Sequence, residues 1–268
     1  MRNRSSSGGS LTDFWSPAQY DKFKHEREQP FIDLMAMVRP ARAMRIVDLG
    51  CGTGALTRKL HTQLEARRTL GLDRSSRMLA EARASVLPAG LTFEVGDIEG
   101  FAGDREYDLI FSNAAFQWVE HHDELIARLV AALKPGGQLL FQVPAMHDDL
   151  SHTAAKALTD TEPFARGFAG WHRPQPVLSP DTYARLLYRH GLAAPSVRLV
   201  VYPHVLDNAE GVFEWMKGTL LTEYARHLPA ELFPSFLEAY RARLLAGLDQ
   251  TTPFFFPFKR ILCWGQKC

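Results

Sequence analysis

Polar side chains stand at the ends of several short apolar runs in the first half of this sequence, where a buried strand would give way to a loop. The first run, residues 45–49, carries Asp48 and leads into the segment Gly50-Cys51-Gly52-Thr53-Gly54. Glycines permit a positive φ and carry no Cβ, and the start of the helix that follows presents unpaired backbone N–H groups. The pattern therefore predicts a loop whose backbone touches a bound ligand.

Two further acids close the next two apolar runs. Asp73 follows about 20 residues after the glycine segment, the spacing at which a carboxylate can accept hydrogen bonds from a ribose diol. Asp97 ends the third run, at the carboxyl edge where open parallel sheets bind ligands, and can accept a hydrogen bond from an adenine amino group. Gly50, Gly52 and Ala55 also satisfy the GxGxxG/A spacing of dinucleotide sites, so an NAD site stays open as an alternative, although the third acid is less expected there.

These residues require a framework of strands that ends at one edge. Strand-like runs cover residues 45–49, 69–72, 91–95, 107–111 and 138–143, and helical patterns cover residues 54–66, 76–85 and 123–133. The segment 133–137 predicts a tight turn between the last of these helices and the fifth strand. Strands joined by crossover helices form a parallel sheet that is covered on both faces. We therefore expect an α/β fold of the Rossmann-like, doubly wound type.

The remaining segments predict additions to that sheet. Residues 13–40 are expected to form an N-terminal helical segment with a kink or break before Pro30, which has no N–H to donate. Beyond residue 144 follow a segment rich in Pro, Gly and aromatic residues (162–176), a helix (180–190), a strand (196–202), a helical block (209–248) and a final strand (254–265). The last two strands would complete a mostly parallel seven-stranded sheet with an antiparallel edge strand, and the insertions 144–195 and 207–250 would form a helical cap. Residues 13–268 are thus predicted to be one domain with 45–143 as its ligand-binding core, and residues 1–12 a disordered tail.

The composition excludes several classes of protein. Of 268 residues 46% are hydrophobic, and 31 basic and 30 acidic side chains leave a formal charge of +1. With so little net charge we expect no nucleic acid partner and no membrane partner. No apolar run approaches the roughly 20 residues that a bilayer requires, and the N-terminal segment lacks the apolar stretch of a secretion signal.

Cysteine and histidine spacing argues against disulfides and metals. Cys51, Cys263 and Cys268 form no CxxC pair, so a disulfide framework is not expected and a cytoplasmic location fits. His121 and His122 are adjacent instead of four residues apart on a helix, so we expect no metal site and interpret them as the start of an exposed helix.

The order of these motifs resembles that of the class I S-adenosylmethionine-dependent methyltransferases. The glycine segment, the acids at the ends of the second and third strands, and the Leu-Lys-Pro-Gly-Gly turn at 133–137 carry the resemblance, which covers residues 45–143. It implies S-adenosylmethionine as the cofactor and S-adenosylhomocysteine as the product, with Asp73 on the ribose, Asp97 and Ile98 beside the adenine, and Asn113 near the methionine end. The cofactor-binding residues expected from it are Asp48, Gly50, Cys51, Gly52, Gly54, Asp73, Arg74, Met78, Asp97, Ile98 and Asn113.

A narrower resemblance, to the trans-aconitate 2-methyltransferase family, extends over nearly the whole chain. It rests on the segment 15–20 (Trp-Ser-Pro-Ala-Gln-Tyr) with Phe23, Glu26, Arg27 and Pro30, on the segment 112–118, and on Glu214-Trp215. It implies esterification of a carboxylate of a small organic acid, with trans-aconitate as the first choice. One departure is Thr222-Glu223 before Tyr224, where relatives often carry Arg-Pro, and it bears on how a tricarboxylate would be held.

Esterification of this kind needs positioning and no general base, because a carboxylate with a pKa near about 4 is already ionised at pH 7. Arg, Lys and Tyr side chains would hold the acid, since guanidinium pairing fits a planar anion. The substrate candidates are Tyr20, Arg27, Lys217 and Arg260, with Trp118 and Trp215 as pocket walls, although large aromatics are more often core residues. Another small metabolite, a carrier-bound acyl group, and a non-catalytic cofactor-binding module stay open as alternatives, and so does the oligomeric state.

Overall fold

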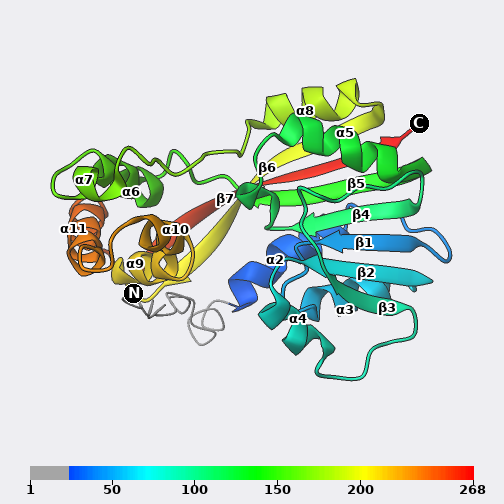
Figure 1. Cartoon of the computed structure of the whole chain (residues 1–268), viewed down its shortest axis with the longest axis horizontal. Coiled ribbons are helices and arrows are strands. Elements are labelled where there is room, and N and C mark those ends of the chain that lie inside the picture. The colour runs from blue at the N-terminus through cyan, green and yellow to red at the C-terminus, as the bar shows by residue number, and fades with distance from the viewer. Residues whose placement is uncertain (1–23) are drawn as a thin grey trace, which may run out of the picture. The chain divides into compact units, whose positions relative to one another are not determined.

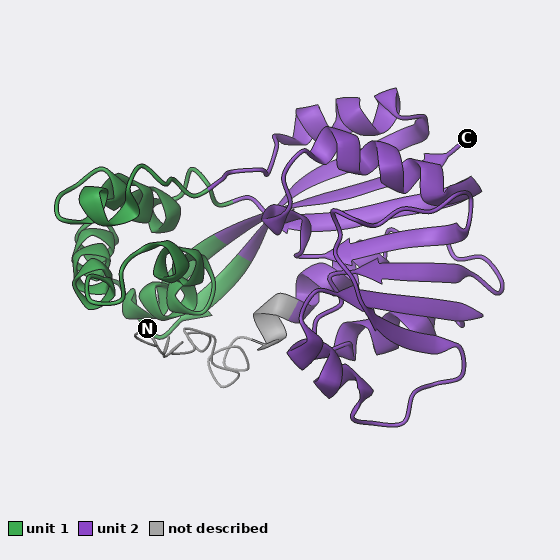
Figure 2. Ribbon diagram, in the orientation of Figure 1, with its two compact units in different colours: residues 1–25, 146–173, 203–257 green, residues 26–145, 174–202, 258–268 purple. Residues whose placement is uncertain are grey.

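The computed structural model describes residues 24–268, and the side chains from residue 28 onward. The chain divides into two units (Figure 2). Within the described range, unit 1 comprises residues 24–25, 146–173 and 203–257, and unit 2 comprises residues 26–145, 174–202 and 258–268. The predicted site residues of the first half of the chain therefore all belong to unit 2.

A seven-stranded sheet in the order β3-β2-β1-β4-β5-β7-β6 forms the centre of unit 2 (Figure 1), and residues 203–206 and 254–257 of its last two strands belong to unit 1. Its strands are β1 (Arg45–Leu49), β2 (Arg68–Asp73), β3 (Leu91–Val95), β4 (Tyr107–Asn113), β5 (Leu133–Pro144), β6 (Leu192–Leu206) and β7 (Phe254–Lys267). Neighbours from β3 through β5 pair in parallel, and β7 pairs antiparallel with β5. The predicted Rossmann-like, mostly parallel sheet is confirmed.

Apolar side chains on the central strands point alternately to the two faces of the sheet and are buried on both, as in a parallel sheet covered on both sides. One face carries Val47, Ile110 and Phe141, and the opposite face carries Ile46 and Leu109. The first face is covered by α5 (His122–Ala132) and α8 (Pro180–Arg189), and the second by α2 (Lys24–Met35) and α3 (Ala55–Gln63). The remaining helix, α4 (Ser76–Arg83), packs on β3, and its N-cap Ser75 accepts a hydrogen bond from the Met78 N–H.

Three of the local predictions differ from the structure. Helix α2 continues through Pro30, so of the predicted kink or break the break is wrong; burial of Phe31 and Leu34 stabilises the helix after the lost hydrogen bond. His122 begins α5 but is buried instead of exposed, because its ring bonds to the Tyr183 hydroxyl at 2.7 Å and to a main-chain carbonyl. Strand β5 begins at Leu133, so residues 133–137, which were predicted to form a turn before the fifth strand, belong to the strand itself.

The insertion predicted for residues 144–195 is divided between the two units. Residues 146–173 lie in unit 1, whereas residues 174–195 lie in unit 2. The physical reason is the apolar side of α8, whose Tyr183, Leu186 and Leu187 belong to the main core cluster. The second part of this insertion therefore supports the sheet and is not an addition to it.

Unit 1 is helical and contains an aromatic cluster. Its helices are α6 (Leu150–Thr159), α7 (Phe164–Phe168), α9 (Glu210–Lys217), α10 (Leu220–His227) and α11 (Phe233–Ala246). Phe168 and Phe236 pack edge to face at 5.6 Å, and the Tyr240 hydroxyl donates to the Ser151 carbonyl at 2.7 Å. The sequence pattern identified neither α6 nor α7 as separate helices. In the described part of the chain, no helix is long and apolar enough to cross a membrane.

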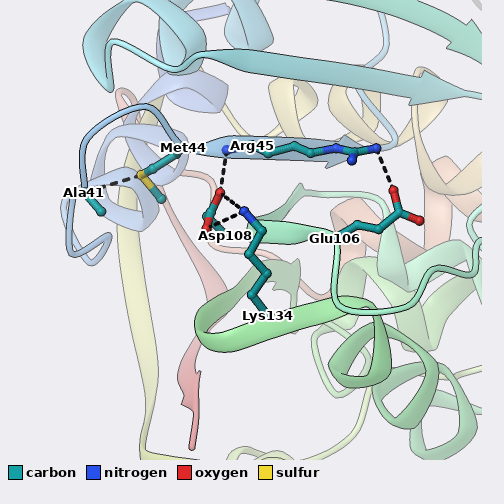
Figure 3. A network of polar contacts seen from close by, with 6 residues as sticks. All are labelled: Ala41, Met44, Arg45, Glu106, Asp108 and Lys134. Carbon is teal, nitrogen blue, oxygen red and sulfur yellow. Dashed lines mark hydrogen bonds and ion pairs between the residues drawn. The ribbon is translucent and has the colours of Figure 1, made fainter.

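Charged side chains join three strands at the amino edge of the sheet, opposite the edge that carries the predicted site (Figure 3). The Asp108 carboxylate accepts the Arg45 backbone N–H at 2.7 Å and the Lys134 ammonium at 2.8 and 3.0 Å. Arg45 also pairs with Glu106 at 2.6 Å. Asp108 therefore links the first residues of β1, β4 and β5.

Replacing Asp108 by alanine is expected to lower the free energy of unfolding by about 1–3 kcal/mol, because the half-buried Arg45 N–H loses a charged acceptor. Lys134→Met should cost only about 0–1 kcal/mol, since the ammonium is partly exposed. Urea denaturation of both variants measures the difference. Equal stability of Asp108→Ala and wild type would show that the network contributes nothing.

Candidate functional site

The loop that leaves β1 has the backbone geometry of a ligand-binding turn. Gly50, Gly52 and Gly54 have φ of +78°, +56° and +71°, in the left-handed region that favours glycine. The N–H groups of Gly50 and Cys51 donate to the Leu72 carbonyl at 2.8 and 2.9 Å, which fixes the loop to β2. Helix α3 begins directly after Gly54 and directs its first N–H groups to the same edge.

Two of the loop glycines also have no room for a side chain. A Cβ at Gly50 would lie 2.3 Å from the Cβ of Ala115, and a Cβ at Gly54 would lie 2.5 Å from the ring of Phe93. At Gly52, in contrast, a Cβ would meet no protein atom within 4 Å. The loop is thus closely packed on its protein side and open at Gly52.

Asp73, at the end of β2, is held between this loop and α4. One carboxylate oxygen accepts the Gly52 N–H and the other accepts the Ser75 N–H, both at 2.8 Å. An ionised carboxylate has about four lone-pair positions, so this half-buried group keeps acceptor capacity for hydroxyl donors. The structure therefore places the Asp73 carboxylate beside the glycine loop, and its role toward a ribose diol remains a prediction.

Asp48 is buried beneath the loop and accepts a hydrogen bond from the Thr57 hydroxyl at 2.6 Å. Burial raises its pKa to about 7, the Thr57 hydrogen bond opposes the shift, and the charge of Asp73 adds to it. Asp48 therefore shapes the loop from below through α3. Thr57 was not predicted, because nothing in the local pattern connects it to an acid nine residues earlier.

The raised pKa of Asp48 makes stability pH-dependent. The folded state binds the proton more tightly than the unfolded state, so this group's contribution is complete below about pH 4 and is lost as pH rises to about 7. An Asp48→Asn variant does not titrate, so its stability relative to wild type should rise by roughly 4 kcal/mol across that window. Urea denaturation at a series of pH values tests this; parallel curves for the two proteins would refute it.

The other predicted cofactor residues surround the same edge. Ile98 is buried, and its Cδ1 would lie 3.5 Å from a Cβ at Gly50. Asp97 is exposed and accepts the Glu99 N–H at 3.0 Å. Arg74 is exposed and Met78 is half-buried at the start of α4. Burial raises the pKa of the Cys51 thiol, so no thiolate chemistry is indicated at this cysteine.

Asn113, the last residue of β4, completes the edge. Its Oδ1 accepts the Gln142 Nε2–H at 2.8 Å, and Gln142 lies directly beside it in β5. Ser112 donates to the Leu49 carbonyl at 2.8 Å and so joins β4 to the beginning of the glycine loop. Gln142 was not predicted as a site residue; its signal was a single amide in the apolar run Leu-Leu-Phe-Gln-Val.

The substrate candidates are spread over both units. In unit 2, Trp118 is 39% exposed, and Arg260 is buried with its guanidinium 3.2 Å from the Gln142 amide oxygen. In unit 1, Trp215 is buried against His204 with ring centroids 4.8 Å apart, and Lys217 pairs with Glu214. Tyr20 and the side chain of Arg27 lie outside the described residues. A substrate role for any of the six remains a prediction.

Comparison with known proteins identifies relatives over most of the chain. Residues 46–137 match a methyltransferase domain family. The chain is 43% identical over 255 residues to a trans-aconitate 2-methyltransferase from Deinococcus radiodurans, covering 92% of this chain and 96% of the relative. Among solved structures, an S-adenosylmethionine-dependent methyltransferase from Mesorhizobium loti aligns with a TM-score of 0.51 at 22% identity, over 88% of this chain and 96% of that one. The YcgJ protein from Bacillus subtilis aligns with a TM-score of 0.62 at 16% identity, over 90% and 98%.

The sheet order, the glycine loop and the strand-end acids define a Rossmann-like methyltransferase. The solved structures share this fold at low identity. The full-length similarity goes further, and the chain belongs to the trans-aconitate 2-methyltransferase family.

Proposed function

We propose that this enzyme transfers a methyl group from S-adenosylmethionine to a carboxylate of a small organic acid, with trans-aconitate as the acceptor. The proposal is carried by Asp73, whose carboxylate is held between the glycine loop and α4 and keeps acceptor capacity for the two hydroxyl groups of a ribose. The family's printed activity supports the choice of acceptor.

The site residues fit an adenosyl cofactor. The open space at Gly52 admits a ligand against the backbone, Asp73 would hold the ribose, and Ile98 would pack against the adenine. When bound, the cofactor supplies an electrophilic methyl group on a sulfonium. Asn113 and the loop would orient its amino-acid end, and the chain needs to provide no base for an acceptor that is already ionised.

Holding the acceptor oxygen in line with the methyl carbon is then the main contribution of the protein, and such positioning can amount to roughly 7–11 kcal/mol in favourable cases. A new C–O bond forms as the S–C bond breaks, and the products are a monoester and S-adenosylhomocysteine.

The described cysteines are unpaired, which supports a reducing compartment such as the cytoplasm.

A methyl-transfer assay tests the proposal. Purified protein is incubated with methyl-labelled S-adenosylmethionine and a panel of di- and tricarboxylic acids that includes trans-aconitate, with Asp73→Ala as the control. Label in the trans-aconitate ester, absent from the control, is the expected result. Ester formation only with another acid would reassign the acceptor, and cofactor binding without any ester would favour a carbon or hydroxyl acceptor or a non-catalytic module.

A further inference from the structure

Arg260 is an unusual residue for the interior of this sheet. Its side chain is 4% exposed in strand β7, and its guanidinium lies over the Phe258 ring at 4.8 Å. Its Nη1–H donates to the Gln142 Oε1 at 3.2 Å. Arginine is seldom buried to this extent because removing its charge from water is costly, so the acceptors around its guanidinium matter, and Gln142 is one of them.

This contact determines how the Gln142 amide is oriented. A guanidinium has only N–H donors, so the side of the amide that faces Arg260 must be the oxygen. The Nε2 of Gln142 then points the other way and donates to the Asn113 Oδ1 at 2.8 Å. Gln142 is 1% exposed, so water does not offer it an alternative partner.

The Gln142 amide in turn orients the amide of Asn113. Because its Oδ1 faces Gln142, its Nδ2 lies on the opposite side of the amide, and among the described residues it has no hydrogen-bond partner. Asn113 ends β4 beside the glycine loop, where Ser112 bonds to the Leu49 carbonyl and Ala115 packs on Gly50. The orientation of one half-buried amide at the sheet edge is thus set by a buried cation two strands away.

We propose that Arg260 is a positioning residue that acts through Gln142 to present the Asn113 Nδ2–H as a hydrogen-bond donor to a carboxylate oxygen of the bound ligands. The proposal rests on the proposed function, which supplies two such carboxylates: that of the amino-acid end of the cofactor and that of the acceptor acid. The positive charge of Arg260 polarises the amide of Gln142 and, through it, the amide of Asn113. The Asn113 Nδ2–H therefore becomes a stronger hydrogen-bond donor to an anion.

The substitution Gln142→Glu separates this role from simple packing. The glutamate still offers oxygens to Arg260 but has no N–H for Asn113, so the Asn113 amide should turn and direct Oδ1 toward the ligand. By calorimetry, the affinity for S-adenosylhomocysteine should fall about 10-fold or more, as for a lost hydrogen bond to a charged group. The affinity for 5′-methylthioadenosine, which lacks the amino-acid end, should change by less than about 2-fold. Selective loss for S-adenosylhomocysteine places the donor on the cofactor.

If the donor serves the acceptor acid instead, both nucleosides bind normally and the KM of the acid rises about 10-fold or more. Gln138→Glu is the matched control, since Gln138 is a buried glutamine of the same strand whose amide bonds to Arg39 and Trp264 at the amino end. This control should change stability without the selective effect. In an Asn113→Ala background, Gln142→Glu should cause no further loss.

Three results would overturn the inference. They are an unchanged affinity and KM in Gln142→Glu, an equal loss for both nucleosides, and a full effect in the Asn113→Ala background. Because Arg260→Met leaves a buried amide oxygen without its donor, Arg260→Lys is measured beside it and should recover most of the selective affinity. If wild-type protein binds S-adenosylhomocysteine and Gln142→Glu changes neither the affinity nor the KM, the positioning role alone is refuted. If wild-type protein binds neither nucleoside, the proposed function and the inference are refuted together.

Discussion

Replacing Asp73 by alanine is expected to weaken binding of S-adenosylhomocysteine by at least about 100-fold, because each hydrogen bond to this charged group contributes about 1.5–3 kcal/mol. The variant loses the acceptor for the ribose hydroxyls. It also loses the carboxylate that holds the Gly52 and Ser75 N–H groups at 2.8 Å, so the loop is no longer fixed for the ligand. Calorimetry measures the affinity directly, and the methyl-transfer rate should fall with it.

Asp108→Ala is the matched control for this experiment. It removes the same side chain from the opposite end of the same sheet, where the acid bonds to Arg45 and Lys134. It should lower stability and leave the affinity unchanged. Asp73→Asn keeps one acceptor oxygen and should lie between alanine and wild type. An Asp73→Ala affinity within about 3-fold of wild type would remove Asp73 from the ribose site, since it would leave less than 1 kcal/mol for its hydrogen bonds.

The parts of this site that could be predicted are those in which neighbouring residues in the chain determine the structure. The run 46–49 and the glycines after it specify a buried strand and a left-handed loop by themselves, and Asp73 and Asp97 follow their strands directly. Parallel strands then bring these ends to one edge without further information. The fold class followed from the same alternation of strands and helices.

The parts that could not be predicted depend on which distant side chains meet. Gln142 and Arg260 are 118 residues apart, and their contact depends on the antiparallel register between β5 and β7. The charge of Arg260 predicts a substrate residue, and that role remains a prediction, but charge in a sequence does not reveal that its guanidinium also donates to the Gln142 amide. Likewise, α8 brings the Tyr183 hydroxyl to the buried ring of His122, and the spacing of α5 does not show this.

Gly52→Ala is expected to weaken cofactor binding much more than it lowers the stability of the fold. Gly52 has φ +56°, and a Cβ there would meet no protein atom within 4 Å. The substitution should therefore cost only the strain of a left-handed alanine, about 1 kcal/mol of the free energy of unfolding. The new methyl group would occupy space that the cofactor needs against the loop, so the affinity for S-adenosylhomocysteine should fall by about 10-fold or more, by analogy with the cost of overpacking.

Gly136→Ala provides the comparison that makes this result interpretable. Gly136 has φ +78° and equally open surroundings, but it lies near the amino end of β5, away from the site. Urea denaturation should show similar losses of stability for the two variants, whereas calorimetry should show weaker binding for Gly52→Ala alone. If both variants bind S-adenosylhomocysteine as wild type does, the ligand does not lie against Gly52. In that case the open space beside Gly52 is not part of the cofactor site, and the proposed contact between the cofactor and the loop backbone would have to be abandoned.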